Sequence, residues 1–281
     1  VATRWNALLA CTPSTANNTC ADKLVSELAP KIFRRPLSST EVTAYQGLAR
    51  GTTGSRTQAE GMQLALAAML SSPQFLYRSE VGTATSGNVY KLDGYEMATY
   101  LSYTLTGSTP NATLLAAAAN GTLNTEAGIR QQAAILLNAA NTKLLLNDFV
   151  NRWLATESLT TQSKDGIANF PQLAADMKLE LGKNFASAML DSSATFASIY
   201  NPTYTMVNQR LATHYGLPFS GTQDADGFVR VNTIDRGGIL TSGAFMSRYA
   251  TPADSNLITR AVAVRRKLMC QDIPEPPAGV S

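Results

Sequence analysis

The sequence has few charges and no long apolar runs. Charged residues make up 15% of its 281 residues, against about 25% in a typical soluble protein. The net charge of +3 is too small to favour nucleic acid as a partner. Its apolar runs, such as residues 114–119, are far shorter than the roughly 18 residues that a membrane span needs. Hydrophobic residues reach 44%, which predicts a folded, compact chain without a membrane span.

Histidine is nearly absent, and this excludes several kinds of active site. His214 is the single histidine, so a metal site with two or three histidine ligands cannot form within the chain. A Ser-His-Asp triad could use only His214, and no Gly-x-Ser-x-Gly motif supplies its serine. The glycine-rich phosphate loops of nucleotide-binding proteins are missing as well. Because His214 lies near the end of a predicted helix, where a cation is favourable, we interpret it as structural.

The acidic residues form no recognisable site. Asp224 and Asp226 resemble part of a calcium loop, but Thr233 stands where the twelfth ligand should be a glutamate, so we predict a turn. A glycosidase needs two carboxylates that face one cleft. The sequence spacing brings together no pair among the candidates, which are Asp148, Glu157, Asp165, Glu180 and Asp191.

The basic clusters also have structural interpretations. Arg34 and Arg35 follow a predicted helix, and we expect them to bond its last carbonyls or to pair with carboxylates. Residues 72–78 indicate a packing corner. Residues 236–241 indicate a tight turn into a helix, although N–H groups at such an entry could also hold an anion. We therefore predict no catalytic, cofactor-binding or metal-binding residue in the chain.

Cysteine is scarce, with three residues, Cys11, Cys20 and Cys270. Cys11 and Cys20 bracket a loop of turn-forming residues that can bring the two sulfur atoms together. We predict a structural disulfide between them and hence an oxidising compartment; two free thiols in a cytosolic loop are the alternative. Cys270 is left over, either as a small buried apolar residue or as the partner of a cysteine outside this chain.

Apolar residues recur at helical spacing along nearly the whole chain. The predicted helices cover residues 21–33, 40–51, 57–70, 93–105, 110–121, 125–137, 141–154, 171–190, 207–215, 240–249 and 257–270, with Ser39 or Thr40 capping the second. Asp93 and Glu96 form a capping box at the start of the fourth. The helix over 171–190 carries an apolar stripe at i, i+4 spacing, which consists of Leu173, Met177, Leu181, Phe185 and Met189. Only residues 89–92 and 228–231 read as extended, and they could pair with each other. The predicted fold class is all-α, a multi-helix orthogonal bundle of about ten helices with at most one small two-stranded ribbon.

Three segments are expected along the chain, packed as one compact unit. Residues 1–80 form an N-terminal helical segment with the Cys11/Cys20 loop, residues 81–235 a central helical domain, and residues 236–281 a C-terminal helical segment with a proline-rich tail. Proline at 274–279 favours an extended spacer, as if another segment followed. Since no signal peptide precedes Val1, we expect a mature or trimmed piece of a protein.

Eight sequence blocks in order carry a resemblance to a known family: FRRPLSSTE (33–41), LSSPQFLYR (70–78), LDGYEMATYLSY (92–103), FVNRWL (149–154), FP (170–171), VNQRLATHYG (207–216), RGGILT (236–241) and VRRKLMCQDIPEPP (264–277). They resemble conserved blocks of planctomycete and myxobacterial secreted proteins that are built from consecutive domains of unknown function associated with c-type cytochromes. The resemblance covers residues 20–280.

The resemblance implies a bacterial protein that is exported and is located outside the cytoplasm, in the periplasm, at the cell surface or in the medium as a secreted protein. Family members typically carry a Cys-x-x-Cys-His haem-attachment motif before or after this region. No cysteine pair here has that spacing, so we expect no cofactor in this chain and c-type haem on adjacent segments. Cys270 matches a family cysteine, which favours a structural role. Residues 255–261 depart from the family pattern, and no catalytic residue is carried over.

Three functions stay open. We favour an exported helical scaffold or partner-docking module of a c-type-cytochrome-associated protein or surface assembly, with no chemistry of its own and with other protein subunits or domains as partners. The alternative is a component of an extracytoplasmic oxidoreductase or electron-transfer protein that carries haem outside this chain. A carboxylate-based, carbohydrate-active hydrolase is the third. None of these requires nucleic acid or a membrane span.

Overall fold

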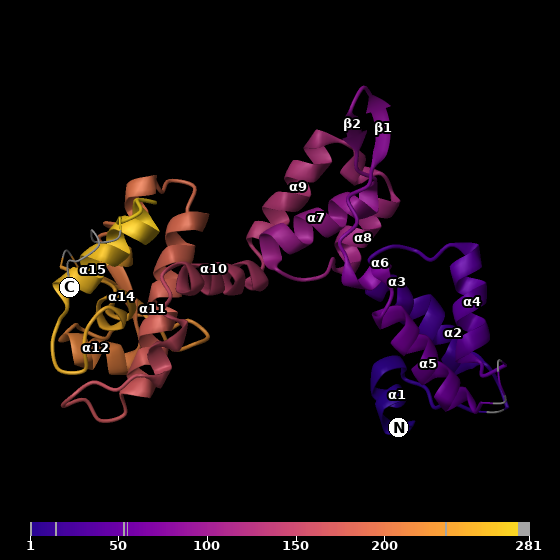
Figure 1. Ribbon diagram of the computed structural model, residues 1–281, viewed down its shortest axis with the longest axis horizontal. Coiled ribbons are helices and arrows are strands. Elements are labelled where there is room, and N and C mark those ends of the chain that lie inside the picture. Colours follow the sequence, from indigo (N-terminus) through magenta and orange to yellow (C-terminus); the bar gives the residue numbers. More distant parts are fainter. Residues whose placement is uncertain (1, 15, 53, 55, 234, 275–281) are drawn as a thin grey trace. The chain divides into compact units, whose positions relative to one another are not determined.

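The computed structural model describes residues 2–14, 16–52, 54, 56–233 and 235–274, and most of them are helical, as predicted. The chain divides into two compact units, Val1–Asn138 and Ala139–Ser281 (Figure 1). None of the helices in the described part combines the length and the hydrophobicity needed to span a membrane. The predicted spacer at 274–279 lies outside the described residues, apart from Pro274.

The first unit consists of short helices and one hairpin. Its elements are α1 (Ala2–Leu9), α2 (Thr19–Lys23), the π-helical η1 (Leu24–Leu28), α3 (Ala29–Phe33), α4 (Ser39–Ala49), α5 (Gln58–Leu70), α6 (Pro73–Leu76), β1 (Thr83–Ser86), β2 (Val89–Lys91), α7 (Gly94–Thr106), α8 (Ala112–Ala119), the 3-10 helix η2 (Thr122–Asn124) and α9 (Glu126–Leu137). The helix predicted over 21–33 is thus present as α2, η1 and α3 in direct succession.

Three helices of this unit begin with a complete capping box, in which the N-cap side chain and a glutamate three residues later satisfy each other's backbone N–H groups. Asp93 and Glu96 start α7, as the sequence predicts, and Thr57 and Glu60 start α5. The cap of α4 is Ser38, which bonds Glu41, so the prediction of Ser39 or Thr40 is wrong. Residue spacing explains why Ser38 is the cap, because at this helix start only Ser38 precedes a glutamate by three residues.

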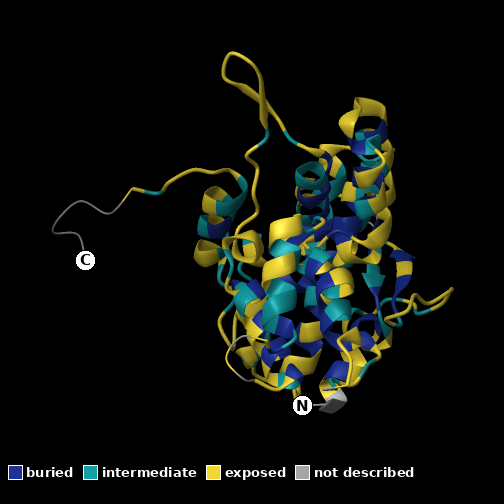
Figure 2. Ribbon diagram, turned by 90° about the vertical axis from the view of Figure 1, so that its right-hand side faces the viewer, coloured by how far each residue is buried: buried dark blue, intermediate teal, exposed yellow. Residues whose placement is uncertain are grey.

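Two hydrophobic clusters stabilise the first unit. One joins α1 to α5 around Trp5, Leu24 and Met62, and the other joins α7, α8 and α9 around Leu101 and Leu114. Gly61 allows α4 and α5 to approach closely, because a Cβ at this position would lie 2.9 Å from the carbonyl oxygen of Ala49. Figure 2 shows buried residues along the inward helix faces and exposed residues outside.

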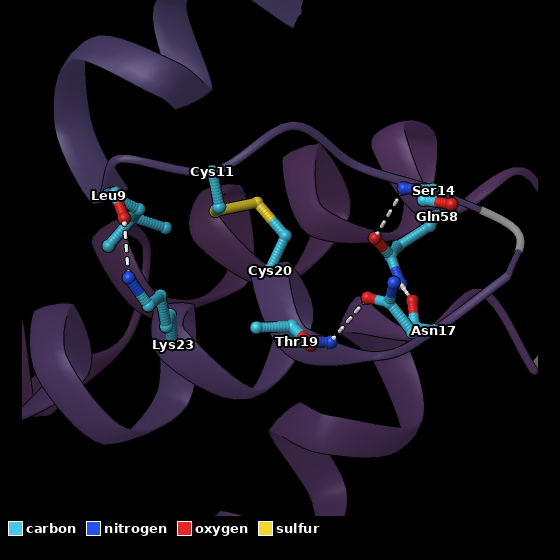
Figure 3. The surroundings of a disulfide bond; sticks show 8 residues. All are labelled: Leu9, Cys11, Ser14, Asn17, Thr19, Cys20, Lys23 and Gln58. Carbon is cyan, nitrogen blue, oxygen red and sulfur yellow. Dashed lines mark hydrogen bonds between the residues drawn. A yellow bond between two sulfur atoms is a disulfide. The ribbon is translucent and has the colours of Figure 1, made fainter.

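A disulfide joins Cys11 to Cys20, as predicted, and ties α1 to α2 (Figure 3). The loop between them is also held by the buried Gln58 of α5. Its Oε1 accepts from Ser14 N at 2.9 Å, and its Nε2 donates to Asn17 O at 2.8 Å. Cys270 is exposed and unpaired with any described cysteine, so the first of its two alternatives, a small buried apolar residue, is wrong.

The second unit is built around one long helix. Its elements are α10 (Ala140–Trp153), the 3-10 helix η3 (Glu157–Thr161), α11 (Phe170–Leu190), the 3-10 helix η4 (Phe196–Ile199), β3 (Tyr204–Val207), α12 (Gln209–Tyr215), β4 (Val229–Asn232), α13 (Gly238–Thr241), α14 (Gly243–Arg248), α15 (Leu257–Ala263) and the π-helical η5 (Val264–Leu268). Trp153 of α10 donates from Nε1 to the carbonyl oxygen of Lys267 at 2.7 Å.

The core of this unit forms on the buried stripe of α11. Leu173, Met177, Leu181 and Phe185 lie one helical turn apart and are buried. Met189, the last member of the predicted stripe, is half exposed. A single hydrophobic cluster joins this stripe to the inner side chains of β4 and to apolar residues of α13 and α14.

The strand pairing predicted from the sequence is wrong. Residues 89–91 pair with β1, their neighbour across a turn at Gly87, which has a positive φ of 58°. Residues 229–232 pair antiparallel with β3. The structure therefore has two small two-stranded sheets where at most one was expected. For residues 89–91 the physical reason is that the adjacent segment β1 closes a hairpin with little loss of chain entropy.

The division into units differs from the three segments expected at 1–80, 81–235 and 236–281. Ile239 and Phe245 of the C-terminal segment belong to the same hydrophobic cluster as Phe170 and Leu181 of α11. The segment after 235 therefore completes the core of the second unit. The predicted helix over 240–249 is also broken, because Ser242 ends α13 and its side chain caps α14 by accepting from Phe245 N.

Candidate functional site

The two arginines after α3 have different partners. Arg34 is buried, and its guanidinium donates to the carbonyl oxygens of Gln74, Phe75 and Tyr77. Arg35 forms a bidentate pair with Glu41, at 2.8 and 2.9 Å. The hydrogen bonds from Arg35 are the main reason that the pKa of Glu41 is lowered to about 2. Both contacts stabilise the fold, in line with the structural interpretation of this cluster.

The Asp224 and Asp226 carboxylates lie at a turn and share one cation. Lys183 Nζ contacts them at 2.7 and 2.6 Å. Asp224 Oδ1 also accepts from the backbone N–H of Asp226 and of Phe228, which leads the chain into β4. The turn predicted here is present. Among the described residues, no group of three His, Cys, Asp or Glu residues is arranged to hold a metal ion.

Residues 236–241 form the tight turn into α13. The Gly237 N–H donates to Thr241 Oγ1 at 2.9 Å. A Cβ on Gly237, whose φ is +156°, would lie 2.7 Å from the carbonyl oxygen of Pro202. Glycine is therefore required here because another backbone segment packs against the turn.

The carboxylates proposed for a glycosidase do not share an environment. Glu180 is 1% exposed, whereas the other four candidates, Asp148, Glu157, Asp165 and Asp191, are exposed. Thr205 Oγ1 donates to Glu180 Oε1 at 2.7 Å, and the Tyr215 hydroxyl donates to Oε2 at 2.6 Å. Burial raises the pKa of Glu180, and these two hydroxyls oppose the rise. The arrangement is that of a buried, hydrogen-bonded core carboxyl group.

Replacement of Glu180 by Gln tests this environment. The pKa of Glu180 in the folded protein lies above its unfolded value of 4.5, so the folded state keeps the proton to higher pH. The stability that Glu180 contributes is therefore complete below pH 4.5 and is lost as the pH rises through the folded pKa. We expect the free energy of unfolding of the wild type, relative to E180Q, to fall as the pH is raised from 4.5. Urea titrations across that range measure it, and a constant difference contradicts it.

Residues 76–91 form an exposed arm of the first unit. Every residue of β1 and β2 is exposed, and the hairpin is coloured as exposed at the top of Figure 2. Five apolar or aromatic side chains of the arm are between 61% and 73% exposed: Leu76, Tyr77, Val81, Val89 and Tyr90. An isolated two-stranded hairpin is marginal in water, so the position of this arm depends on its base.

The base of the arm is fixed at two points. Glu96, in the first turn of α7, accepts hydrogen bonds from the backbone N–H groups of Val81 and Gly82. Burial raises the pKa of Glu96, but these bonds and one from Asp93 N outweigh it, and the pKa is lowered. Arg34 holds the chain at Gln74–Tyr77 by its carbonyl oxygens. The arm thus has an anchored base and an exposed tip.

A groove of about 940 Å³ lies in the second unit, between the start of α11, helix α12 and the loop before β4. Its wall is rich in amide side chains: Asn169, Gln172, Asn208, Gln209 and Gln223. Arg210 also lines it. The Nε atom of Arg210 lies 3.1 Å from Oδ2 of the buried Asp176, and this contact is an ion pair that does not have the geometry of a hydrogen bond.

His214 lines this groove, which the sequence did not suggest. Partial desolvation of its imidazole and the nearby Arg236 guanidinium both lower the pKa of His214. At neutral pH the ring is therefore mainly uncharged, which differs from the expectation of a cation at the end of α12. The groove residues come from three separated segments, and no motif in the sequence links them.

Three segments of the chain match family models. Residues 20–80 match PSD5, a protein of unknown function (DUF1595), residues 92–217 match PSD4 (DUF1592), and residues 236–281 match PSCyt3 (DUF1588). By their names, the DUF1595, DUF1592 and DUF1588 families are associated with cytochrome c, in line with the resemblance found in the sequence. No curated protein and no solved structure matches the chain.

The two candidate surfaces lie partly between the matched segments. The β1–β2 hairpin falls between the DUF1595 and DUF1592 matches, and the loop with Phe219 and Gln223 falls between the DUF1592 and DUF1588 matches. The DUF1592 match also runs across the division after Asn138. The matched segments therefore cover only part of each surface.

Proposed function

We propose that the chain is a helical docking module of an exported, cytochrome c-associated protein, and that its arm, residues 76–91, binds a c-type cytochrome domain. The observation that carries the proposal is the full exposure of the β1–β2 hairpin together with its apolar and aromatic side chains. Exposed apolar groups that cluster on one element favour protein partners.

The chemistry of the arm suits a protein interface. Tyr77 and Tyr90 offer large apolar faces with a polar tip, a residue type enriched at interface cores. Neither face of the hairpin is covered by the rest of the first unit, so its backbone edges are accessible to another chain. Within residues 81–91 the only charged side chain is Lys91, so binding through this segment requires little desolvation of charge.

The choice of a c-type cytochrome as the partner rests on the names of the matched families. DUF1595, DUF1592 and DUF1588 are associated by name with cytochrome c. The Cys11–Cys20 disulfide is compatible with an oxidising compartment. An extracytoplasmic location, with haem carried outside this chain, follows as part of the proposal.

Titration with a purified bacterial monohaem c-type cytochrome tests this function. We expect saturable binding by calorimetry with a Kd of about 10–100 µM, in the range of transient encounters. Hydrogen exchange of residues 76–91 should slow in the complex. The V81S/Y90S variant should bind at least about tenfold more weakly, because it removes two exposed contacts and no buried one.

The control is Phe196→Ser in the second unit, since Phe196 is 75% exposed and lies outside the arm. This variant should bind as the wild type does. Equal binding by V81S/Y90S and the wild type would refute docking through the arm. An absence of saturable binding would refute the choice of a cytochrome as partner.

A further inference from the structure

We propose that the groove in the second unit binds a neutral saccharide. The groove is a separate surface from the arm, and this inference does not depend on docking of a cytochrome. It rests on three properties of the wall: its amide side chains, the pairing of its charges, and an apolar patch at its edge. Together these fit a polyhydroxylated ligand better than an ion or an apolar molecule.

The amide side chains give the wall hydrogen-bonding capacity without charge. An amide presents a donor and an acceptor side by side in one plane, and adjacent hydroxyl groups of a sugar ring present the complementary pair. Some of this capacity is used internally: Asn208 caps α12, and Gln172 Oε1 accepts from Arg210 at 2.9 Å. The Nε2 group of Gln172 remains a donor beside the groove.

The charged side chains in the wall are already paired. Arg210 faces Asp176, which is buried behind it, and Asp226 is bound by Lys183 at 2.6 Å. His214 is mainly neutral at pH 7, because its pKa is lowered. A charged ligand would have to compete with these existing ion pairs, whereas a neutral ligand leaves them in place.

The edge of the groove supplies an apolar contact. Phe219 lines it and is partly buried against the hydrophobic core, which fixes the ring, whereas Leu173 in the same lining is only 5% exposed and belongs to the core. A sugar ring has an apolar face of C–H groups that packs on an aromatic side chain. The groove is open to solvent, since most of its lining side chains are exposed, so it can accept part of a longer chain.

Calorimetry and saturation-transfer NMR with hexasaccharides of glucose, xylose, mannose and N-acetylglucosamine test the proposal, with oligogalacturonate as an anionic comparison. We expect at least one neutral oligosaccharide to bind with a Kd at or below about 1 mM. Its affinity should not change between about 50 mM and 500 mM NaCl, because no net charge is engaged. Salt-sensitive binding of the oligogalacturonate alone, or no saturable binding, would overturn it.

Variants locate the site. Gln223→Ala changes an exposed side chain and should leave the thermal midpoint unchanged while weakening binding several-fold. Phe219→Ala should weaken binding by at least about tenfold. The matched control is Phe196→Ala, an exposed aromatic residue of the same unit outside the groove. If both groove variants bind like the control, the saccharide is bound elsewhere and the proposal is wrong.

Discussion

Replacement of Arg34 by Met is expected to lower the free energy of unfolding of the first unit by about 3–5 kcal/mol. The guanidinium donates to the carbonyl oxygens of Gln74, Phe75 and Tyr77, and the residue is only 5% exposed. Met fills similar volume but leaves these acceptors without their donor. Urea unfolding followed by hydrogen exchange of peptides from residues 29–77 measures the loss.

Arg78→Met is the matched control for this prediction. Arg78 is exposed and lies over the same aromatic ring as Arg34, that of Tyr103, at 5.1 Å against 5.9 Å. We expect Arg78→Met to cost less than about 1 kcal/mol, as exposed cation–π contacts do. Similar losses for the two variants would show that the ring contact, and not the carbonyl bonding, carries the effect. A folded Arg34→Met protein should also show faster exchange in the arm.

Removal of the Cys11–Cys20 disulfide is the second change that we expect to lower the free energy of unfolding by a large amount. The Cys11–Cys20 bond closes a short loop, with a sequence separation of 9, and the loss of such a cross-link costs about 3 kcal/mol through the entropy of the unfolded chain. The C11S/C20S variant should therefore have a lower free energy of unfolding. Hydrogen exchange should increase first in α1 and in the loop held by Gln58.

A single substitution separates the covalent bond from the rest of the loop. Gln58→Ala leaves the disulfide intact and removes the bonds to Ser14 N and Asn17 O, so it should cost about 1–2 kcal/mol. Thiol reduction of the wild type should reproduce the effect of C11S/C20S. If reduction leaves hydrogen exchange near α1 unchanged, the loop is held by its hydrogen bonds alone, contrary to the prediction.

Local signals in this sequence were sufficient for much of the fold. The capping box at Asp93 and Glu96 specified the start of α7, and the turn-rich loop between Cys11 and Cys20 specified the disulfide. Such features depend on residues close together in the chain, so their chemistry can be read without knowing the tertiary structure. The stripe of α11 was visible for the same reason.

Features that depend on distant partners were not visible. The pairing of Tyr204–Val207 with Val229–Asn232 joins strands separated by α12 and a long loop. The break at Ser242 arises because the serine caps α14, an option that helical periodicity does not distinguish from continuation. The groove combines α11, α12 and the loop before β4, so no single motif in the sequence indicates it.

The position of the two tryptophans makes each unit optically distinguishable. Trp5 is 4% exposed among the helices of the first unit, and Trp153 is bonded to the Lys267 carbonyl in the second; the sequence has no other tryptophan. A Trp5→Phe protein therefore emits indole fluorescence from the second unit alone, and a Trp153→Phe protein from the first alone. Emission spectra of these two variants can follow ligand effects in one unit without interference from the other.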